Sequence, residues 1–336
     1  MQRSLAPEPL DLSVIEDQVD IESTENPPDP DWELRYAKVR QYISGEVPLV
    51  ERLEGLRLAL NDSHPSVRYC AVTILKGMDE LEVTDHLIYA LSDSYEWVRI
   101  RAIEGLGERH AISASELFVQ YLDKEDNPKV KATFVKHLGR FQEEKFIPII
   151  ANYLNDPDAR VRANSVEGLG FYPSEMVQHI IRPFLDDDNA RIRANVAVVL
   201  SKSKDTTAAE TIESMLNSPN TYERMGAIYT IGELQDEKYI STLFGFLNDP
   251  SYLVQRNVRD ALIKFGLQIQ GPLLKEIRSK KSMHFILGAI QVIASIGDKK
   301  SLKTLLKLQE IGDGEVRATA EEAIDKICAR VDGVIA

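Results

Sequence analysis

One short pattern recurs between residues 60 and 317 with a period of roughly thirty residues. Each copy holds an acidic turn, then a valine or isoleucine followed by a cation, then a helical stretch that ends near glycine. The clearest copies occupy 155–163 and 186–194. A period of this length is typical of stacked helical hairpins, in which each hairpin contacts only its neighbours. We therefore expect an extended array of helices rather than a globule built around one pocket.

The valine or isoleucine of each copy, called the anchor here, defines the register of the array. The clear anchors follow one another at a nearly constant step, and the weaker copies keep that step. One further copy is degenerate, with its helix near 288–296, and a clear copy closes the series, which makes about nine units. The anchors are Val67, Val98, Val130, Val161, Ile192, Glu223, Val254 and Val316.

A glycine follows most anchors by nine or ten positions. Glycine has no Cβ and enters the left-handed conformation that commonly closes a helix. The spacing therefore predicts left-handed helix ends at Gly77, Gly107, Gly139, Gly170 and Gly232.

Within a copy, the apolar residues have helical spacing. Val161, Val166 and Leu169 fall on one helical face, and the preceding run 146–154 shows the same spacing. Asp156-Pro157 separates the two runs, and a residue before proline is biased away from helix. Neither helix buries its apolar stripe alone, so the sequence predicts hairpins that stack. Alternating patterns typical of strands are not found.

This pattern resembles the HEAT-repeat family, especially the short bacterial type called phycobilisome-lyase-like repeats, over roughly residues 50–330. The resemblance implies a buried ladder in which turn aspartates bond the arginines of neighbouring units, because a guanidinium offers five donors. Ser218, Lys131 and Gln255 depart from the pattern, and looser junctions are expected there. The aspartates are Asp62, Asp93, Asp156, Asp187, Asp249 and Asp313, and the arginines are Arg68, Arg99, Arg162, Arg193, Arg224 and Arg317.

The predicted fold is an all-α, right-handed α-solenoid of about nine HEAT-type helical hairpins. Residues 31–60 are expected to form two N-terminal cap helices, and residues 61–330 the solenoid itself. Residues 1–30 are expected to be a disordered acidic tail, because they hold eight acids, five prolines and one arginine, a net charge of −7. The tail either keeps the chain in solution or carries a short interaction motif around 10–19.

The sign of the charge reverses near the C-terminus, in a chain whose net charge is −13. Between residues 275 and 307 eight cations face two acids, a local balance of +6. This basic patch is either a solvated lysine-rich surface or a docking site for an acidic partner or for the tail of a neighbouring molecule. Its members are Lys275, Arg278, Lys280, Lys281, Lys299, Lys300, Lys303 and Lys307.

Several enzyme and binding classes are built on helical repeats, but this chain lacks the residues that they need. Di-iron hydroxylases need paired His-Glu motifs, and none of the six histidines is followed by glutamate. A base-excision enzyme needs a basic groove, which the acidic balance opposes. No nucleophile–base set, phosphate loop or cysteine metal box is found, so we expect no catalytic residues, cofactor or metal. The absence of a signal-like or membrane-spanning apolar run favours the cytoplasm.

The HEAT-type resemblance places partner contacts on the concave face, which the second helix of each hairpin lines. Positions two, three and six after the anchors are expected to be exposed there, with bulky residues at both ends of a floor of alanines. Regularly spaced asparagines there either bind a peptide backbone or join adjacent units. The predicted contact residues are Tyr69, Ile100, Arg101, Glu104, Lys136, Asn164, Glu167, Asn195, Met225, Tyr229, Arg256, Asn257 and Asp260.

We predict a non-enzymatic scaffold that binds a protein, extended or acidic, on this face, with no nucleic acid and no membrane insertion. The alternative is a bilin-lyase-like or other tetrapyrrole-binding protein, which the name of the repeat subtype suggests. Such a protein needs aromatic walls and cations for the propionates. Tyr69, Tyr95, Trp97 and Arg101 are the candidates for that role.

Overall fold

The computed structural model describes residues 31–44, 46–203, 205–279 and 282–332 of the protein. The expected acidic tail and the predicted patch residues Lys280 and Lys281 lie outside these ranges. Within them, the regular structure is helical and contains no strand, which confirms the all-α prediction. None of the helices in these ranges is long and apolar enough to cross a membrane.

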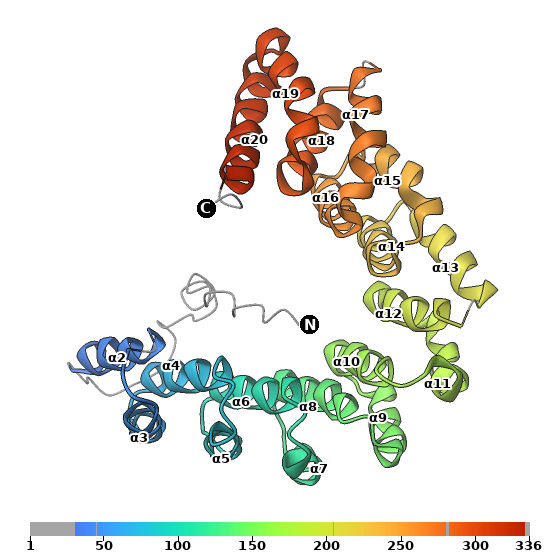
Figure 1. Ribbon diagram of the computed structural model, residues 1–336. Coiled ribbons are helices and arrows are strands. Elements are labelled where there is room, and N and C mark those ends of the chain that lie inside the picture. Colours follow the sequence, from blue (N-terminus) through green and yellow to red (C-terminus); the bar gives the residue numbers. More distant parts are fainter. Residues whose placement is uncertain (1–30, 45, 204, 280–281, 333–336) are drawn as a thin grey trace, which may run out of the picture. The chain divides into compact units, whose positions relative to one another are not determined.

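The chain divides into two compact units, residues 1–172 and 173–336. In the N-terminal unit, α2 precedes four hairpins, and Figure 1 shows their second helices side by side in one row. The elements are α2 (Trp32–Arg40), α3 (Leu49–Ala59), α4 (Pro65–Lys76), α5 (Val83–Ala90), α6 (Glu96–Glu108), α7 (Ser115–Leu122), α8 (Pro128–Arg140), α9 (Ile147–Asn152) and α10 (Ala159–Leu169). Helices α2 and α3 lie where the two cap helices were expected.

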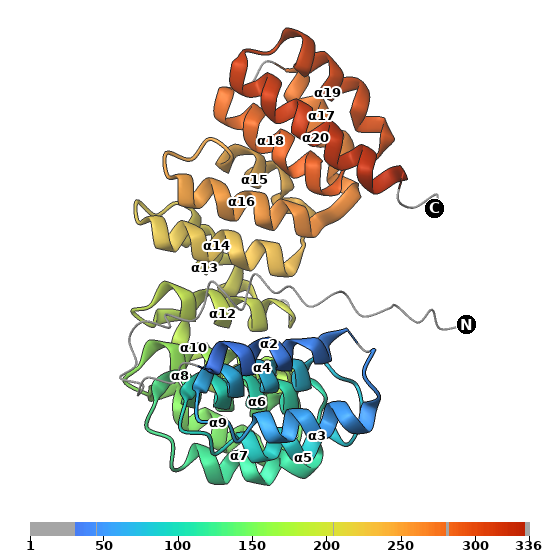
Figure 2. The same cartoon turned by 90° about the vertical axis from the view of Figure 1, so that its left-hand side faces the viewer.

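The C-terminal unit holds five hairpins, and Figure 2 shows α12, α14 and α16 one above another below α17–α20. With the four of the N-terminal unit, the described residues form nine hairpins, as the repeat count predicted. The elements are α11 (Ser174–Ile181), α12 (Ala190–Ser201), α13 (Thr206–Leu216), α14 (Thr221–Leu234), α15 (Ile240–Phe246), α16 (Tyr252–Phe265), α17 (Gln270–Arg278), α18 (Met283–Ile296), α19 (Lys299–Ile311) and α20 (Gly314–Asp332).

The second helices begin at polar side chains that the turns supply. Asn127 accepts hydrogen bonds from the backbone N–H groups of Lys129 and Val130, and Asp158 accepts one from Arg160. These bonds satisfy donors that have no partner inside the helix. The anchors that follow, such as Val130 and Val161, are fully buried. In α8 and α10, turn chemistry and apolar spacing therefore agree on where the helix starts and which face it buries, whereas α6 and α16 begin without a side-chain cap.

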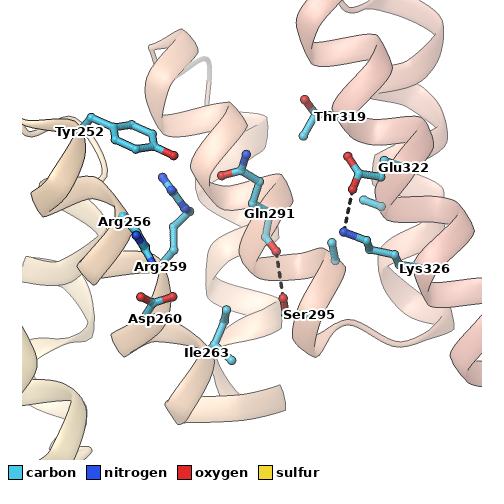
Figure 3. A pocket seen from close by; sticks show the side chains of 12 residues that line it. Tyr252, Arg256, Arg259, Asp260, Ile263, Gln291, Ser295, Thr319, Glu322 and Lys326 are labelled. Carbon is cyan, nitrogen blue, oxygen red and sulfur yellow. Dashed lines mark hydrogen bonds and ion pairs between the residues drawn. The ribbon is translucent and has the colours of Figure 1, made fainter. Parts of the chain in front are cut away.

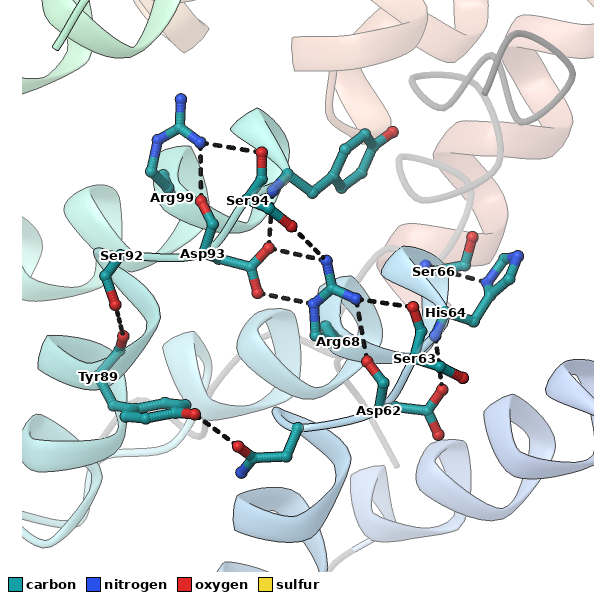
Figure 4. A network of polar contacts seen from close by, with 12 residues as sticks. Asp62, Ser63, His64, Ser66, Arg68, Tyr89, Ser92, Asp93, Ser94 and Arg99 are labelled. Atoms are coloured by element: carbon teal, nitrogen blue, oxygen red, sulfur yellow. Dashed lines mark hydrogen bonds and ion pairs between the residues drawn. The ribbon is translucent and has the colours of Figure 1, made fainter. Parts of the chain in front are cut away.

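An aspartate–arginine ladder joins successive hairpins, as the resemblance implied (Figure 4). Arg68 donates to both carboxylate oxygens of Asp93 in the next turn, at 2.7 and 3.0 Å. It also donates to the carbonyls of Asp62 and Ser63 in its own turn, at 2.9 and 3.1 Å. One guanidinium thus bonds two consecutive turns and satisfies carbonyls that the turn leaves open. The ladder is a structural feature of the stack rather than a binding site.

The other ladder contacts show how departures from the pattern are accommodated. Glu125 takes the aspartate position opposite Arg99 at 3.0 Å, which the search for aspartates missed. Gln255 replaces an arginine and still donates to the carbonyl of Asp249 at 2.8 Å, although it makes no ion pair there. The remaining ladder pairs within the two units are Arg35–Asp62, Arg193–Glu223 and Arg224–Asp249.

The prediction of left-handed glycines at the helix ends is wrong. Gly77 and Gly170 end their helices with φ of −80° and −66°. Three of the predicted glycines, Gly107, Gly139 and Gly232, lie instead where neighbouring second helices approach closely: a Cβ on Gly139 would lie 2.0 Å from the carbonyl oxygen of Gly168. Close packing between helices, and not backbone freedom, accounts for glycine here. Left-handed residues do occur just after helices, at His110, Gln142 and Gln235.

Candidate protein-binding face

The second helices of each unit form one row, called here the second-helix face of that unit. The sequence predicts that the residues two positions after the anchors are exposed. Most of them are buried instead: Tyr69 is 2% exposed and Ile100 is 6% exposed. The reason is that each second helix packs between its two neighbours in the row. Asn164 of α10 donates to the carbonyl of Ala132 in α8 at 2.9 Å, which illustrates how tightly the helices meet.

In the N-terminal unit, the charged residues predicted for this face bond to one another. Arg101 donates to the Tyr69 hydroxyl at 3.0 Å and to Glu104 at 2.9 Å. Lys76 of α4 also pairs with Glu104, at 2.8 Å, and Lys136 of α8 pairs with Glu167 of α10 at 2.7 Å. These contacts join neighbouring helices, and this face therefore offers a partner few groups that are not already bonded inside the chain.

The environment of Glu104 shows how firmly that cluster is bonded. Burial acts to raise the pKa of its carboxyl, but Lys76 and Arg101 outweigh this effect and lower the pKa below the ordinary value. The carboxylate therefore stays ionised and holds both cations. A ligand that used Arg101 would have to displace a partner that is already paired.

The asparagine row is structural in part. Asn164 joins adjacent hairpins, as the structural interpretation predicted. Asn195 is only 4% exposed, and Asn257 donates to the carbonyl of Leu253 in its own helix at 2.9 Å. The row therefore does not present three free amides to a peptide.

The C-terminal unit has a different second-helix face. Predicted residues Arg256 and Asp260 of α16 line an open groove of about 420 Å³ with residues of α18 and α20 (Figure 3). We call it the α16–α20 groove. Its lining residues are Tyr252, Arg256, Arg259, Asp260, Ile263, Gln291, Ala294, Ser295, Thr319, Glu322, Ala323 and Lys326.

Cations and an aromatic ring are available in this groove. The Tyr252 ring is 67% exposed, and the Arg259 guanidinium carbon lies 5.5 Å from its centroid. Among the described residues, no carboxylate lies within ion-pair distance of Arg256 or Arg259. Lys326 across the groove pairs with Glu322 on the same helix at 2.7 Å. Donors are thus available on α16 that have no counterpart on the N-terminal face.

The floor and the remaining wall of the groove suit an elongated ligand. Ala294 and Ala323 are buried small residues, which leave room above α18 and α20. The exposed Gln291 lies between the arginines and Lys326 in Figure 3, and its amide offers both a donor and an acceptor. A peptide backbone needs both kinds of group.

The sequence pattern missed Tyr252, Arg259, Gln291 and Lys326 as groove residues. A signal was present, since 252, 256, 259 and 263 follow the spacing of one helical face. Of the other predicted residues, Met225 and Tyr229 lie on α14. Tyr229 is 41% exposed, with the Lys264 ammonium 5.5 Å from its ring centroid.

The predicted basic patch lies on α17 and α19, which are first helices and therefore lie outside the second-helix face. Its described members are Lys275, Arg278, Lys299, Lys300, Lys303 and Lys307, all exposed. As for metal ligands, His, Cys, Asp and Glu side chains of the described ranges form no group of three that could hold an ion.

Comparison with known proteins identifies the family. The profile for HEAT repeats matches residues 115–200, 152–229 and 209–282, which together cover 168 of the 336 residues. The chain belongs to the HEAT-repeat family. This agrees with the resemblance inferred from the turn aspartates and arginines, and with the nine hairpins.

The first of the similar solved structures below supports the fold alone. A structure of the complex of CpcE and CpcF of phycocyanin lyase from Nostoc sp. PCC7120 is similar with a TM-score of 0.50 at 18% identity, over 72% of this chain and 94% of that chain. YibA of E. coli is similar with a TM-score of 0.44 at 17% identity, over 80% and 98% of the chains. Human deoxyhypusine hydroxylase has a TM-score of 0.31 at 17% identity, over 70% and 99%. No curated protein sequence matches significantly.

Proposed function

We propose that this HEAT-repeat protein is a protein-binding scaffold whose α16–α20 groove receives an extended peptide segment carrying a carboxylate. One observation carries the proposal: Arg256 and Arg259 have no carboxylate partner among the described residues, and Arg259 lies against an exposed Tyr252 ring. Arginine and tyrosine are enriched among residues that dominate binding energy at protein interfaces.

The chemistry of the groove supports a peptide rather than a flat protein surface. A carboxylate between Arg256 and Arg259 would accept charge-assisted hydrogen bonds from two guanidinium groups. Gln291 would bond the peptide backbone beyond it, and the small floor residues leave space for the chain to lie along α18 and α20. The ring of Tyr252 would cover an apolar side chain at the open end.

The contrast with the N-terminal unit supports the same conclusion. There, the charged residues Arg101, Glu104, Lys136 and Glu167 are bonded to neighbouring helices. Binding to that face would first break pairs that hold the hairpins together. The α16–α20 groove imposes no such cost, which is why the proposal places the partner in the C-terminal unit.

The tetrapyrrole alternative is not favoured by its candidate residues. Tyr69 is buried and Arg101 is paired, while Trp97 packs against the Lys129 ammonium at 5.1 Å from its ring centroid. Tyr95 is the N-cap residue of α6. The similarity to a chain of the phycocyanin lyase complex is a similarity of fold, so no bilin is assigned to this protein.

A displayed library of random peptides, selected on the full chain, tests the proposal. We expect enrichment of peptides with an acidic residue beside an apolar one, and a loss of binding of at least tenfold in the double variant Arg256→Glu with Arg259→Glu. The matched control is Lys38→Glu with Lys124→Glu, which reverses two exposed charges outside both the groove and the basic patch. Equal binding by both double variants would exclude the groove, and retention of a coloured bilin instead of peptides would favour the alternative.

A further inference from the structure

Helix α14 exposes a stripe of large apolar side chains beside the α16–α20 groove. Tyr222, Met225 and Tyr229 follow the i, i+3, i+7 spacing of one helical face, over about 10 Å of the helix axis. Tyr222 is 69% exposed and Tyr229 is 41% exposed, and Met225 between them is partly exposed. We call these three residues the α14 stripe.

The equivalent positions of neighbouring repeats carry different side chains. These positions lie one residue before the anchor and two and six residues after it. At them, α8 and α10 have a charged residue, an alanine and a second charged residue. The residues are Lys129, Ala132 and Lys136 in α8, and Arg160, Ala163 and Glu167 in α10. Helix α14 departs from this pattern at all three positions, toward tyrosine and methionine, which are enriched at protein interfaces.

The stripe is continuous with the groove because α14 lies next to α16 (Figures 1 and 2). Leu253 of α16 holds the position equivalent to Tyr222 and is 47% exposed. Its neighbour in the chain, Tyr252, lines the groove with a ring that is 67% exposed. Exposed apolar surface therefore leads from the stripe to the groove within the C-terminal unit.

A charged pair closes the C-terminal end of the stripe. The Lys264 ammonium of α16 lies 5.5 Å from the ring centroid of Tyr229 and pairs with Glu233 of α14. The cation holds one side of the tyrosine ring, so part of the cost of ordering that ring on binding is already met. The polar end also limits the apolar surface of α14 to about two helical turns, which is room for one or two ligand side chains.

The distance from the stripe to the arginines sets the dimensions of a ligand that touches both. Neighbouring helices pack about 8–10 Å apart, and an extended chain advances about 3.3 Å per residue. A segment that runs from Arg256 to the stripe therefore crosses this distance with about three residues. Successive side chains of an extended chain point to opposite faces, so residues two or four positions apart face the same way.

We infer that the α14 stripe is a second subsite of the groove, which receives an aromatic or aliphatic side chain two to four residues from the carboxylate that Arg256 and Arg259 bind. The inference rests on the proposed function of the groove. It narrows the ligand to an extended segment that carries one acidic and one large apolar residue at this spacing.

Synthetic peptides with one glutamate and one phenylalanine in a glycine–serine background test this spacing. The phenylalanine is placed two, three, four or eight residues from the glutamate, and fluorescence anisotropy gives the dissociation constant of each peptide for the full chain. We expect the best of the three short spacings to bind at least tenfold more tightly than a peptide without phenylalanine. The spacing of eight is expected to gain less than twofold.

Two variants assign this gain to the stripe. Tyr222→Ser with Tyr229→Ser is expected to abolish the tenfold gain and to keep the weaker binding that depends on glutamate. The matched control is Leu81→Ser with Tyr89→Ser, which removes two apolar side chains of the N-terminal unit that are 87% and 55% exposed. This control is expected to keep the full gain.

The outcomes separate this inference from the groove proposal. A gain that persists in the stripe variant, or that is equal at all four spacings, would overturn the inference and leave the groove proposal standing. Binding that Arg256→Glu with Arg259→Glu does not weaken would overturn the groove proposal instead, and a chain that binds none of the peptides would overturn both. Sedimentation tests a second copy as the occupant: if the natural chain dimerises and the stripe variant does not, the stripe is an interface between copies and the inference is wrong.

Discussion

Replacing Arg68 tests whether the ladder stabilises the stack through burial of its ion pairs. The Arg68 and Asp93 side chains are only 12% and 8% exposed, and two hydrogen bonds join them. Arg57 and Glu54 make a pair of the same geometry, at 2.9 and 2.7 Å, but on the surface, at 53% and 57% exposure. The chain thus contains its own matched control.

The expected loss follows from the groups left without partners. Arg68→Met removes the cation beside Asp93 and two donors to the carbonyls of Asp62 and Ser63. Removing one member of a buried pair costs about 3–5 kcal/mol. We expect about 3 kcal/mol, the low end of that range, because the backbone N–H of Tyr95 still donates to Asp93 at 2.8 Å. At a urea m-value of about 2 kcal/mol/M, this lowers the midpoint by about 1.5 M.

Urea unfolding followed by circular dichroism measures the loss, and hydrogen exchange in α4 and α6 locates it. Arrays of repeats do not always unfold in one step, so the local measurement decides where the stability was lost. Arg57→Met is expected to leave the midpoint nearly unchanged because water solvates both partners. The explanation by burial is refuted if the two variants shift the midpoint equally.

Three further predictions concern other buried positions. Gly139→Ala is expected to destabilise the fold by about 1–3 kcal/mol because its Cβ meets a backbone carbonyl. Gly245 has open space around it, so Gly245→Ala is expected to stabilise α15 by up to about 1 kcal/mol. Thermal unfolding of both variants checks this contrast. Burial lowers the pKa of His137 to about 3, so its unfolded state binds a proton below pH 6.5 that the folded state does not, and stability is lost as pH falls from about 6.5 to 3. At pH 4.5 the free energy of unfolding is expected to be about 2–3 kcal/mol lower than at neutral pH. Urea unfolding at several pH values measures this loss, and the assignment to His137 is contradicted if the His137→Leu variant shows the same pH dependence. Burial raises the pKa of the Cys70 thiol to about 12, so iodoacetamide is expected to alkylate Cys328 in the native protein and Cys70 only after unfolding.

The sequence alone was sufficient for the fold class. The constant period, the buried anchors and the turn aspartates are all local features, and each repeats often enough to outweigh single exceptions. The ladder was implied by the resemblance to HEAT repeats, and Arg68 and Asp93 carry that resemblance because they occupy fixed positions in consecutive copies. Gln255 and Glu125 show that the position matters more than the residue: both keep part of the contact although neither matches the pattern.

Exposure within the row of second helices was decided by tertiary structure. Tyr69 and Arg256 hold the same position after their anchors, yet Tyr69 of α4 is buried and bonded to Arg101 of α6, while Arg256 lines an open groove. A helical period indicates which face a residue lies on, but the distance to the next helix depends on packing along the whole row. The same holds for Gly107, Gly139 and Gly232: their spacing is visible in the sequence, but only the structure shows that neighbouring helices approach closely at these positions. The pattern of repeats therefore determined the stack, and the gaps between neighbouring helices determined where an open groove forms.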